Sequence, residues 1–433
     1  MKEDLTVFWF RRDLRIDDNH GLFKALSEKN KVLPIFIFDT NILEKLEKED
    51  KRLTIIFTAL DRINDAMKRN RCNVGMYLGK PKAVFLSLIN KYNITKVITN
   101  KDYEPYAIQR DNNIKSLLNS KGIIFESYKD QVIFEENEIV KDNGDPYRVY
   151  TPYSNKWLQK FKLTPQKSFP SQEKIFNFYK TSQPLLNEKE IGFNKYDLDF
   201  TFDVSENIIN KYNSTRNFPS LNSTSRVGLH LRFGTVSIRS LVYYSAKFKD
   251  ITFLKELIWR EFFMQILWHY PSTVKKSFKE EYDNIDWINN ELEFERWCNG
   301  ETGYPLIDAG MKQLNETGFM HNRCRMATGS FLCKHLLIDW RWGEKYFAKK
   351  LLDYEQSSNI GNWQWVAGCG VDAAPYFRIF NPSEQIKKFD KELNYIKKWV
   401  PNFQNPDYAR PIVNHKEARE RCLNTYKAAL NKV

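Results

Sequence analysis

The sequence lacks an apolar run as long as a membrane-spanning helix, which needs about 20 residues. It also lacks a secretory signal, because MKEDLTVFWF is followed at once by the charged residues Arg11, Arg12 and Asp13. No segment is of low complexity, and no internal repeat is evident. We therefore expect a cytoplasmic protein with no membrane partner, and 433 residues are enough for two or three domains.

Cysteine is scarce and is not spaced for metal binding or for a disulfide framework. No two cysteines form a C-x-x-C pair among Cys72, Cys298, Cys324, Cys333, Cys369 and Cys422. Structural zinc and iron–sulfur sites need closely spaced thiolates, so we expect no metal centre. The six thiols are expected to stay reduced, as is usual in the cytoplasm.

Glycine is missing where a dinucleotide-binding turn would need it. The first predicted strand is followed by FRRDLRIDDNHG, without a glycine-rich turn. A pyrophosphate approaches such a turn closely only where glycines clear the space. The sequence therefore argues against a Rossmann-type FAD or NAD site in the N-terminal part.

The charge is unbalanced towards the basic side, with a formal net charge of +13 and a pI of about 9.2. Lysines and arginines gain free energy when they neutralise phosphates and release counterions. This suggests a nucleic acid as partner, although many basic proteins bind none.

The N-terminal part alternates between short apolar runs and amphipathic patterns. Strand-like runs occur at Thr6–Phe10, Lys31–Asp39, Val74–Leu78, Lys96–Asn100 and Ile123–Ser127. Apolar strands separated by helices are typical of a parallel sheet covered on both faces. We predict an α/β domain with a five-stranded parallel sheet over residues 1–130, then a long linker over 131–205 that is rich in Asn, Lys, Ser and Pro.

Residues 206–433 are predicted to form an all-helical domain. Helical patterns occur at Phe253–His269, Tyr304–Thr317, Asn322–Ile338, Glu344–Tyr354 and His415–Leu430. Nine of the eleven tryptophans fall in this part. A relay of electrons through indoles is one interpretation of that number, and ordinary core packing is the commoner one.

A short polar string lies where the linker gives way to helices. Thr224, Ser225, Arg226, Val227 and Gly228 combine hydroxyls, an arginine and a glycine at a predicted helix start. Such a string can hold a phosphate, because backbone N–H groups and the helix dipole favour anions there. An ordinary helix cap is the alternative.

Two long segments carry a resemblance to a known family. They are GYPLIDAGMKQLNETGFMHNRCRMATGSFLCKHLLIDWRWGEKYF and NIGNWQWVAGCGVDAAPYFRIFNP, and the match extends from FWFRRDLRIDDNHGL to PIVNHKEAR. The sequence resembles the photolyase/cryptochrome family, and most closely the class I cyclobutane pyrimidine dimer photolyases. The resemblance implies an α/β domain, a connector and a helical domain that binds FAD, in agreement with the missing glycine turn.

The resemblance implies which residues bind the flavin. They are Tyr212, Thr224, Ser225, Arg226, Val227, Gly228, Phe253, Arg260, Arg325, Asp353, Tyr354, Glu355 and Asn359. Arg325 and Asp353 are expected as a charged pair beside the isoalloxazine ring, and Asn359 near its N5. The sequence departs from the family at Gly228, where a Ser is usual, and at Glu355, where an Asp is common.

The resemblance also implies which residues meet a flipped-out dimer in DNA. They are Arg216, Glu256, Trp259, Asn322, Arg323, Met326, Trp365 and Arg378. Glu256 is expected to be a protonated acid, because burial beside Trp259 would raise its pKa, and to hydrogen-bond a dimer carbonyl as negative charge arrives. Trp259 and Trp365 are expected to stack on the dimer. Arg216 and Arg378 are expected at the DNA backbone.

By resemblance, Trp363, Trp340 and Trp287 form an electron relay, with Trp363 nearest the flavin and Trp287 at the surface. The implied reaction begins when reduced FAD absorbs light and lends one electron to the dimer. The cyclobutane ring opens and the electron returns, without net redox change. The protein contributes positioning and a dry pocket.

Two other functions stay open at this point. A cryptochrome would have the same fold and flavin but would act as a light sensor, and a further alternative is a protein that holds DNA without repair. A second, antenna chromophore is also open. Folate-using relatives carry a glutamate where this sequence has Ala107, which argues against a folate, and a deazaflavin, another flavin or no antenna remain. The family resemblance favours a monomer.

Overall fold

The computed structural model describes residues 3–431, which divide into two compact units. The α/β unit comprises the chain up to Glu138, Leu158–Phe202 and Arg226–Lys249. The helical unit comprises Ile139–Trp157, Asp203–Ser225 and the chain from Asp250 onward. The chain thus divides differently from the three consecutive domains that we expected at 1–130, 131–205 and 206–433.

Charge pairs explain why a segment of the expected helical domain belongs to the α/β unit. Helices α8 (Gly228–Phe233) and α9 (Ile238–Ser245) lie in this segment. Arg239 donates to Asp130 at 2.8 Å, and Arg15 donates to the carbonyl of Gly234 at 3.0 Å. Arg239, Asp130 and Arg15 are all buried, so these bonds hold the two helices to the α/β unit.

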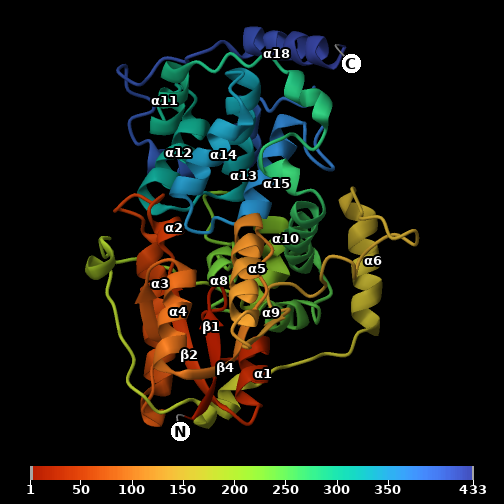
Figure 1. Cartoon of the computed structure of the whole chain (residues 1–433). Helices are drawn as coiled ribbons and strands as arrows, with labels where there is room; N and C mark the ends of the chain where they lie inside the picture. The colour runs from red at the N-terminus through yellow and green to blue at the C-terminus, as the bar shows by residue number, and fades with distance from the viewer. Residues whose placement is uncertain (1–2, 432–433) are drawn as a thin grey trace. The chain divides into compact units, whose positions relative to one another are not determined.

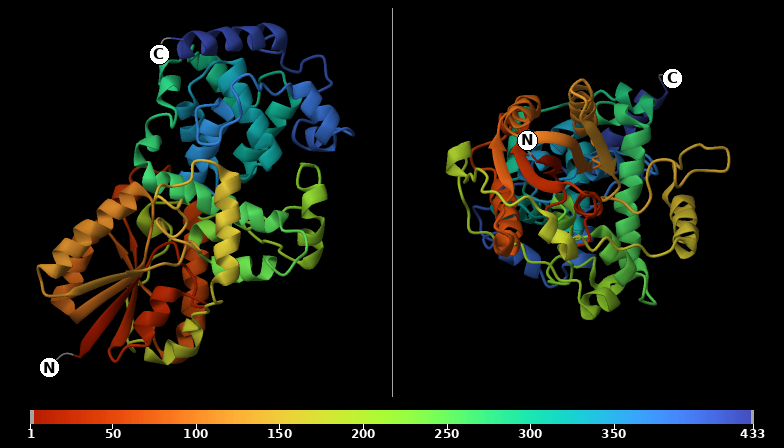
Figure 2. Two further views of the ribbon diagram at one scale, coloured as in Figure 1. Left: turned by 90° about the vertical axis from the view of Figure 1, so that its right-hand side faces the viewer. Right: turned by 60° about the horizontal axis from the view of Figure 1, so that its bottom comes forward.

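The α/β unit is built on one parallel sheet, as predicted. Its strands are β1 (Asp4–Phe10), β2 (Lys31–Phe38), β3 (Gly75–Leu78), β4 (Asn93–Asn100) and β5 (Ile124–Tyr128). They pair in the order β3-β2-β1-β4-β5, and every pair is parallel. The strands fan out with helices on both sides (Figure 2), and β1, the central strand, is buried from Leu5 to Phe10.

The helices of the α/β unit lie around this sheet (Figure 1). Besides α8 and α9, they are α1 (His20–Leu26), α2 (Thr40–Leu43), α3 (Arg52–Met67), α4 (Pro81–Lys91) and α5 (Pro105–Asn119), with short 3₁₀ turns at Lys68–Asn70, Ser171–Asn177 and Lys189–Ile191. Asn19 caps α1 with its side chain, and a proline begins α4 and α5. These are the residues that favour helix starts.

The helical unit contains no strand among its described residues. Its helices are α7 (Glu206–Thr215), α10 (Thr252–His269), α11 (Glu291–Asn299), α12 (Pro305–Thr317), α13 (Asn322–Ser330), α14 (Trp340–Lys350), α15 (Gln356–Ala367), α16 (Pro382–Phe389), α17 (Asn394–Trp399) and α18 (His415–Leu430), with 3₁₀ turns at Pro271–Val274 and Glu280–Asn284. Helix α6 (Tyr150–Leu163) begins in this unit and ends in the other.

Two predicted helix boundaries were wrong. The helix expected at Asn322–Ile338 stops at Ser330 and continues only as a π-helical turn, Phe331–His335. The helix expected at Glu344–Tyr354 runs from Trp340 to Lys350, because the Asp339 side chain caps its start. The π-helical turn includes Lys334, which is buried.

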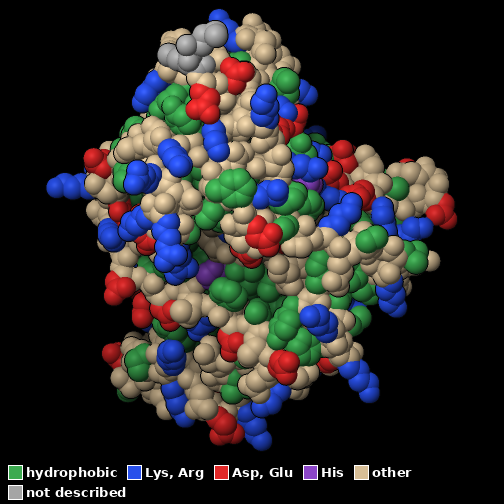
Figure 3. Space-filling view, turned by 90° about the horizontal axis from the view of Figure 1, so that it is seen from below, with side chains coloured by type: hydrophobic (Ala, Val, Ile, Leu, Met, Phe, Trp, Pro, Cys, Tyr) green, Lys and Arg blue, Asp and Glu red, His purple; other side chains and the backbone are tan. Residues whose placement is uncertain are grey.

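Six buried cysteines are unpaired, in agreement with the expected thiols. Across residues 3–431, no helix combines the length and the apolar character that crossing a bilayer requires. On the face seen in Figure 3, basic and acidic side chains are interspersed, so the net positive charge is not gathered into one patch there.

Candidate functional site

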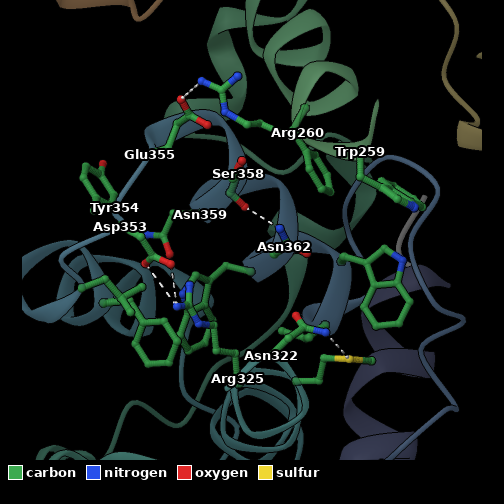
Figure 4. Close-up of a pocket in the computed structure, with 18 of the residues that line it drawn as sticks. Trp259, Arg260, Asn322, Arg325, Asp353, Tyr354, Glu355, Ser358, Asn359 and Asn362 are labelled. Carbon is green, nitrogen blue, oxygen red and sulfur yellow. Dashed lines mark hydrogen bonds and ion pairs between the residues drawn. The ribbon is translucent and has the colours of Figure 1, made fainter. Parts of the chain in front are cut away.

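A cavity of about 380 Å³ lies within the helical unit. Its walls come from α10, α13, α14 and α15 and from the segment between α14 and α15 (Figure 4). These helices and that segment carry most of the residues that the family resemblance singled out. We refer to this space as the helical cavity.

Two arginine–carboxylate pairs line the helical cavity. Arg325 donates to Asp353 at 2.8 and 3.1 Å, and its Nε donates to the carbonyl of Met320 at 2.7 Å. Arg260 donates to Glu355 at 3.0 Å. The predicted pair of Arg325 and Asp353 is therefore present, and the longer Glu355 side chain reaches an arginine of its own. Fixed charges of both signs at one wall suit a ring with polar edges.

Asn359 lies on the same wall and is held by Glu344 of α14. Its amide nitrogen donates to the Glu344 carboxylate at 2.9 Å and to the Glu344 backbone carbonyl at 3.0 Å. Burial raises the pKa of the Glu344 carboxyl, and hydrogen bonds from Asn359 and Tyr354 oppose that rise.

The rest of the wall is apolar and closely packed. Phe347, Leu351, Trp363 and Val366 contribute side chains, and Gly329 contributes none. A flavin ring system needs apolar walls along its flat faces and donors and acceptors at its polar edge. This set of residues provides both, so it fits the isoalloxazine of FAD.

The predicted dimer-binding residues lie around the same cavity. Its lining includes Arg216, Glu256, Trp259, Asn322, Met326 and Trp365. Asn322 and Met326 occupy successive turns of α13, with 3.8 Å between the Asn322 amide nitrogen and the Met326 sulfur. The structure thus brings the two predicted groups of residues together in one space.

Trp259 is stacked on a residue that we did not predict. The rings of Tyr150 and Trp259 are parallel to within 7°, with centroids 3.6 Å apart. The Tyr150 hydroxyl donates to the carbonyl of Lys255 at 2.8 Å, and its backbone N–H donates to the Asp372 carboxylate at 3.1 Å. Tyr150 therefore covers one face of the indole and is itself fixed at both ends.

The expected burial of Glu256 was wrong. Its side chain is 34% exposed and forms an ion pair with Arg216. Glu256 lines the cavity with about a third of its side chain exposed, so Trp259 does not bury it. The partner is the arginine that we assigned to the DNA backbone.

Two further predicted residues, Arg323 and Arg378, are not among the cavity's lining residues. The Arg323 guanidinium lies 4.1 Å from the ring centroid of Phe389 and donates to Asn217 at 2.5 Å. Burial lowers the pKa of Arg323, and the charges of Arg216 and Arg378 lower it further. Arg378 is exposed, and its backbone carbonyl accepts a 2.9 Å hydrogen bond from Lys334.

Of the three predicted relay tryptophans, two are buried and one is partly exposed. Trp363 lines the cavity and is 3% exposed, and Trp340 is 1% exposed. Trp287 is partly exposed and meets Tyr426 edge-on at 6.0 Å. Gly343 lets α14 approach Trp363, because a Cβ there would lie 2.1 Å from Cη2 of the indole. The order of the relay stays a prediction.

The remaining predicted flavin residues lie on other segments. Tyr212 of α7 packs edge-on against Phe253 of α10 at 5.3 Å, within the helical unit. Thr224 and Ser225 belong to the helical unit, and Arg226, Val227 and Gly228 belong to the α/β unit. Arg226 has a left-handed backbone, with φ of 54°, and α8 begins at Gly228. The role of this string stays a prediction.

Ala107, the position that bears on the antenna, is buried on α5.

Sequence reasoning missed several residues of the cavity wall, among them Phe263, Ser358, Asn362 and Val366. The helical periodicity of the sequence could have identified three of them, Ser358, Asn362 and Val366. Counting from Glu355 in steps of three and four residues gives Ser358, Asn359, Asn362 and Val366 on one face of α15. Nothing in the sequence near Tyr150 or Glu344 marked either residue.

Comparisons with known proteins agree with this geometry. Residues 6–172 match the family model described as DNA photolyase, and residues 253–406 match the FAD binding domain of DNA photolyase. A deoxyribodipyrimidine photo-lyase of Agrobacterium fabrum is 33% identical over 99% of this chain and 98% of its own. The enzyme of the same name from Escherichia coli is 31% identical over 98% of both chains.

Solved structures are similar over the whole chain. A bacterial class III photolyase from Agrobacterium tumefaciens has a TM-score of 0.87 at 30% identity and covers 100% of this chain and 99% of its own. An archaeal photolyase from Sulfolobus tokodaii, whose structure holds two FAD molecules, has a TM-score of 0.81 at 33% identity, covering 98% of this chain and 100% of its own. A cryptochrome from Synechocystis, at 23% identity and a TM-score of 0.85 over 98% of this chain and 99% of its own, shares the fold.

Proposed function

The chain belongs to the DNA photolyase family, and from that premise we propose that it repairs cyclobutane pyrimidine dimers in DNA, as a light-driven deoxyribodipyrimidine photo-lyase. FAD is the cofactor of this family. The observation that carries the proposal is the helical cavity, because a single space is lined both by Arg325, Asp353 and Asn359 and by Trp259, Met326 and Trp365. A flavin and an extruded pair of bases can therefore meet there.

When bound, reduced FAD supplies the chemistry: excited by light, it lends the dimer one electron and takes it back after the two carbon–carbon bonds between the bases have broken. The residues of this chain position the reactants. Trp259 and Trp365 offer flat faces to the bases, and the apolar walls exclude water. Asn322, which is exposed, adds a polar side chain to the cavity lining.

Arg216 connects DNA binding to the cavity in this proposal. In the free protein it forms an ion pair with Glu256. A DNA phosphate competes for the same guanidinium, since arginine binds phosphates and carboxylates with similar geometry. Binding of DNA then releases the Glu256 carboxyl, which in its protonated form donates a hydrogen bond to a carbonyl of the dimer.

The decisive experiment compares light with darkness on DNA that contains one thymine dimer. Restoration of adjacent thymines in light alone, in single-stranded or duplex DNA, supports the proposal. A protein that binds FAD and responds to light but leaves the dimer intact refutes it, and that result supports the sensor function of a cryptochrome. Tight binding of dimer DNA without repair in light supports the other alternative.

Two variants separate the roles within the repair reaction. Glu256→Ala is expected to keep its FAD content but to lose about tenfold in repair per absorbed photon, in line with the loss of one stabilising group. Trp363→Phe is expected to lose light-driven reduction of oxidised FAD, yet to repair normally after chemical reduction. Repair that fails in chemically reduced Trp363→Phe contradicts the relay role.

A further inference from the structure

Lys334 is a buried lysine that contacts the segment between α15 and α16 from the inside of the helical unit. It lies in the π-helical turn Phe331–His335, and 1% of its surface is exposed. Its ammonium group donates to the backbone carbonyl of Arg378 at 2.9 Å. Turns of this kind are rare and often occur at functional sites. The family resemblance assigned no role to Lys334.

The burial of this ammonium group costs free energy that its partner does not fully recover. A lysine is seldom buried unless a carboxylate pairs with it, and a neutral carbonyl compensates less. Among residues 3–431, no carboxylate forms an ion pair with Lys334. Proteins keep such costly groups mainly where they serve a function, so the backbone that Lys334 contacts is informative.

The bond from Lys334 is one of two that fix the backbone of Arg378. The Arg378 N–H donates to the carbonyl of Pro375 at 2.9 Å, and its own carbonyl accepts the bond from Lys334. Earlier in the segment, the Asp372 carboxylate accepts a 3.1 Å hydrogen bond from the backbone N–H of Tyr150. The segment is therefore held at residues 372 and 378, while the Arg378 side chain is exposed.

The exposed guanidinium of Arg378 belongs to a group of cations. Burial lowers the pKa of Arg323, and the charges of Arg216 and Arg378 lower it further, so the three arginines are close enough to repel one another. Arg216 pairs with Glu256 in the cavity lining, but no carboxylate in the described part of the chain pairs with Arg378. Arginines bind phosphates closely, so a partner that carries several phosphates fits this group.

We propose that Lys334 is a positioning residue for DNA, which holds the backbone of Arg378 from the interior so that the exposed guanidinium meets a phosphate. The inference rests on the proposed function only in taking dimer-containing DNA as the ligand. Lys334 itself touches neither DNA nor flavin in this scheme. A lysine suits the task, because its long stem reaches from a helical turn to a loop and its ammonium group makes a charge-assisted hydrogen bond.

The test is a double-mutant cycle on the binding of an oligonucleotide with one thymine dimer, measured in darkness with FAD-loaded protein at several salt concentrations. Lys334→Met removes the donor and keeps a side chain of similar length. Its dissociation constant is expected to rise about tenfold, and its salt dependence to fall by about one phosphate contact. Arg378→Ala is expected to do the same. Because Lys334 acts through Arg378, the double variant is expected to bind as Arg378→Ala does.

Lys427→Met is the matched control, because Lys427 is an exposed lysine of α18, a helix that contributes no residue to the described cavity lining. It is expected to change neither the affinity nor the salt dependence. A Lys334→Met protein that binds like this control overturns the proposal. Effects of Lys334→Met and Arg378→Ala that multiply in the double variant overturn it as well.

A lysine that serves folding alone would lower the FAD content or the unfolding free energy and leave the salt dependence of DNA binding unchanged, which is a further result against the proposal. If Lys334→Met does not retain FAD, Lys334→Leu is judged by the same cycle and the same salt dependence.

Binding in darkness separates this inference from the proposed function. A wild type that binds dimer-containing DNA but repairs no dimer in light refutes repair and leaves the cycle valid. A wild type that repairs dimers, together with a Lys334→Met protein equal to the control, refutes the role of Lys334 alone. A wild type that does not bind this DNA refutes both.

Discussion

Both units contain arginine–carboxylate pairs, but in the α/β unit the pairs fill space at the edge of the sheet and in the helical unit they line a cavity. In the α/β unit, arginines and carboxylates meet where β1 and β4 end: Arg11 pairs with Asp111, and Arg12 pairs with Asp102 and Glu104. In the helical unit, the pairs of Arg325 with Asp353 and of Arg260 with Glu355 line a cavity.

The sheet order makes this contrast informative. Strands β1 and β4 are neighbours where the strand order reverses, which is the place where open parallel sheets usually bind ligands. Here the Arg11 guanidinium fills part of that place, bonded to Asp111 and to the carbonyl of Asn100. In the α/β unit the paired charges occupy the space where a ligand would bind. In the helical unit the pairs line a cavity beside an apolar wall, which leaves room for a ligand.

The largest expected effect comes from breaking the charge pairs of Arg11 and Arg12 at the end of β1. Asp111→Ala leaves Arg11, whose side chain is 8% exposed, without its carboxylate partner and also removes a partner of Arg110. Loss of one member of a buried ion pair costs about 3–5 kcal/mol of unfolding free energy. Denaturant unfolding measures it, with Asp65→Ala as control, because Asp65 pairs with Lys68 on the exposed surface. A loss no larger than in the control would show that the network contributes little.

A lone buried charge in the helical unit sharpens the comparison with these paired ones. Lys334 is buried and donates to a neutral carbonyl, and burial lowers its pKa to about 8 from 10.5. The unfolded chain therefore binds a proton between pH 8 and 10.5 that the folded chain does not, so unfolding free energy rises with pH across that window.

Lys334→Met is expected to abolish this rise, which amounts to about 2–3 kcal/mol at about 1.4 kcal/mol per pKa unit. The measurement is the difference in unfolding free energy between wild type and variant from pH 7 to 10. Parallel curves for the two proteins would contradict the lowered pKa.

Filling the helical cavity's wall is expected to have a smaller effect. Gly343→Ala places a Cβ 2.1 Å from Trp363 and 2.6 Å from Leu332, so the indole must move. Overpacking of this kind costs about 1–3 kcal/mol. Light-driven reduction of FAD should slow as well, because Trp363 leaves its position. Lys345→Ala, exposed on the same helix, should change neither.

The smallest expected change in stability is at the pair that lines the cavity. Asp353→Asn removes the charge that faces Arg325, and both side chains are partly exposed. We expect FAD affinity to fall about tenfold, or about 1.4 kcal/mol, while the unfolding of the FAD-free protein hardly changes. Equilibrium binding of FAD measures the first effect and denaturant unfolding the second, with Glu384→Gln as an exposed control. A large loss of unfolding free energy in FAD-free Asp353→Asn would show that this pair stabilises the fold, as we expect of the pairs in the α/β unit.

The sequence was sufficient for the elements that depend on local patterns. The five strands were found within a few residues, since buried parallel strands are continuous apolar runs. Helix α18 begins and ends as predicted, because Asn414 caps an amphipathic run. The pair of Arg325 and Asp353 came from motif resemblance, and the structure joins the two side chains.

Long-range contacts explain what the sequence did not predict. Helices α8 and α9 belong to the α/β unit through Arg239 and Asp130, which are 109 residues apart. The exposure of Glu256 depends on where Arg216 lies, and Tyr150 reaches Trp259 from another helix. No local pattern records such pairings, because they exist only once the chain has folded.

The stack of Tyr150 on Trp259 has a consequence for how a base is selected. With one face of the indole already occupied by Tyr150, whose hydroxyl is bonded to the carbonyl of Lys255, a base that binds as we propose would approach from the other face and meet a surface two rings thick. Such a rigid platform suits two bases locked together by covalent bonds, which present a fixed outline. Under the proposed repair function, separate, freely turning bases would lose more mobility on it, so discrimination between damaged and intact DNA would begin with stiffness rather than with hydrogen bonds.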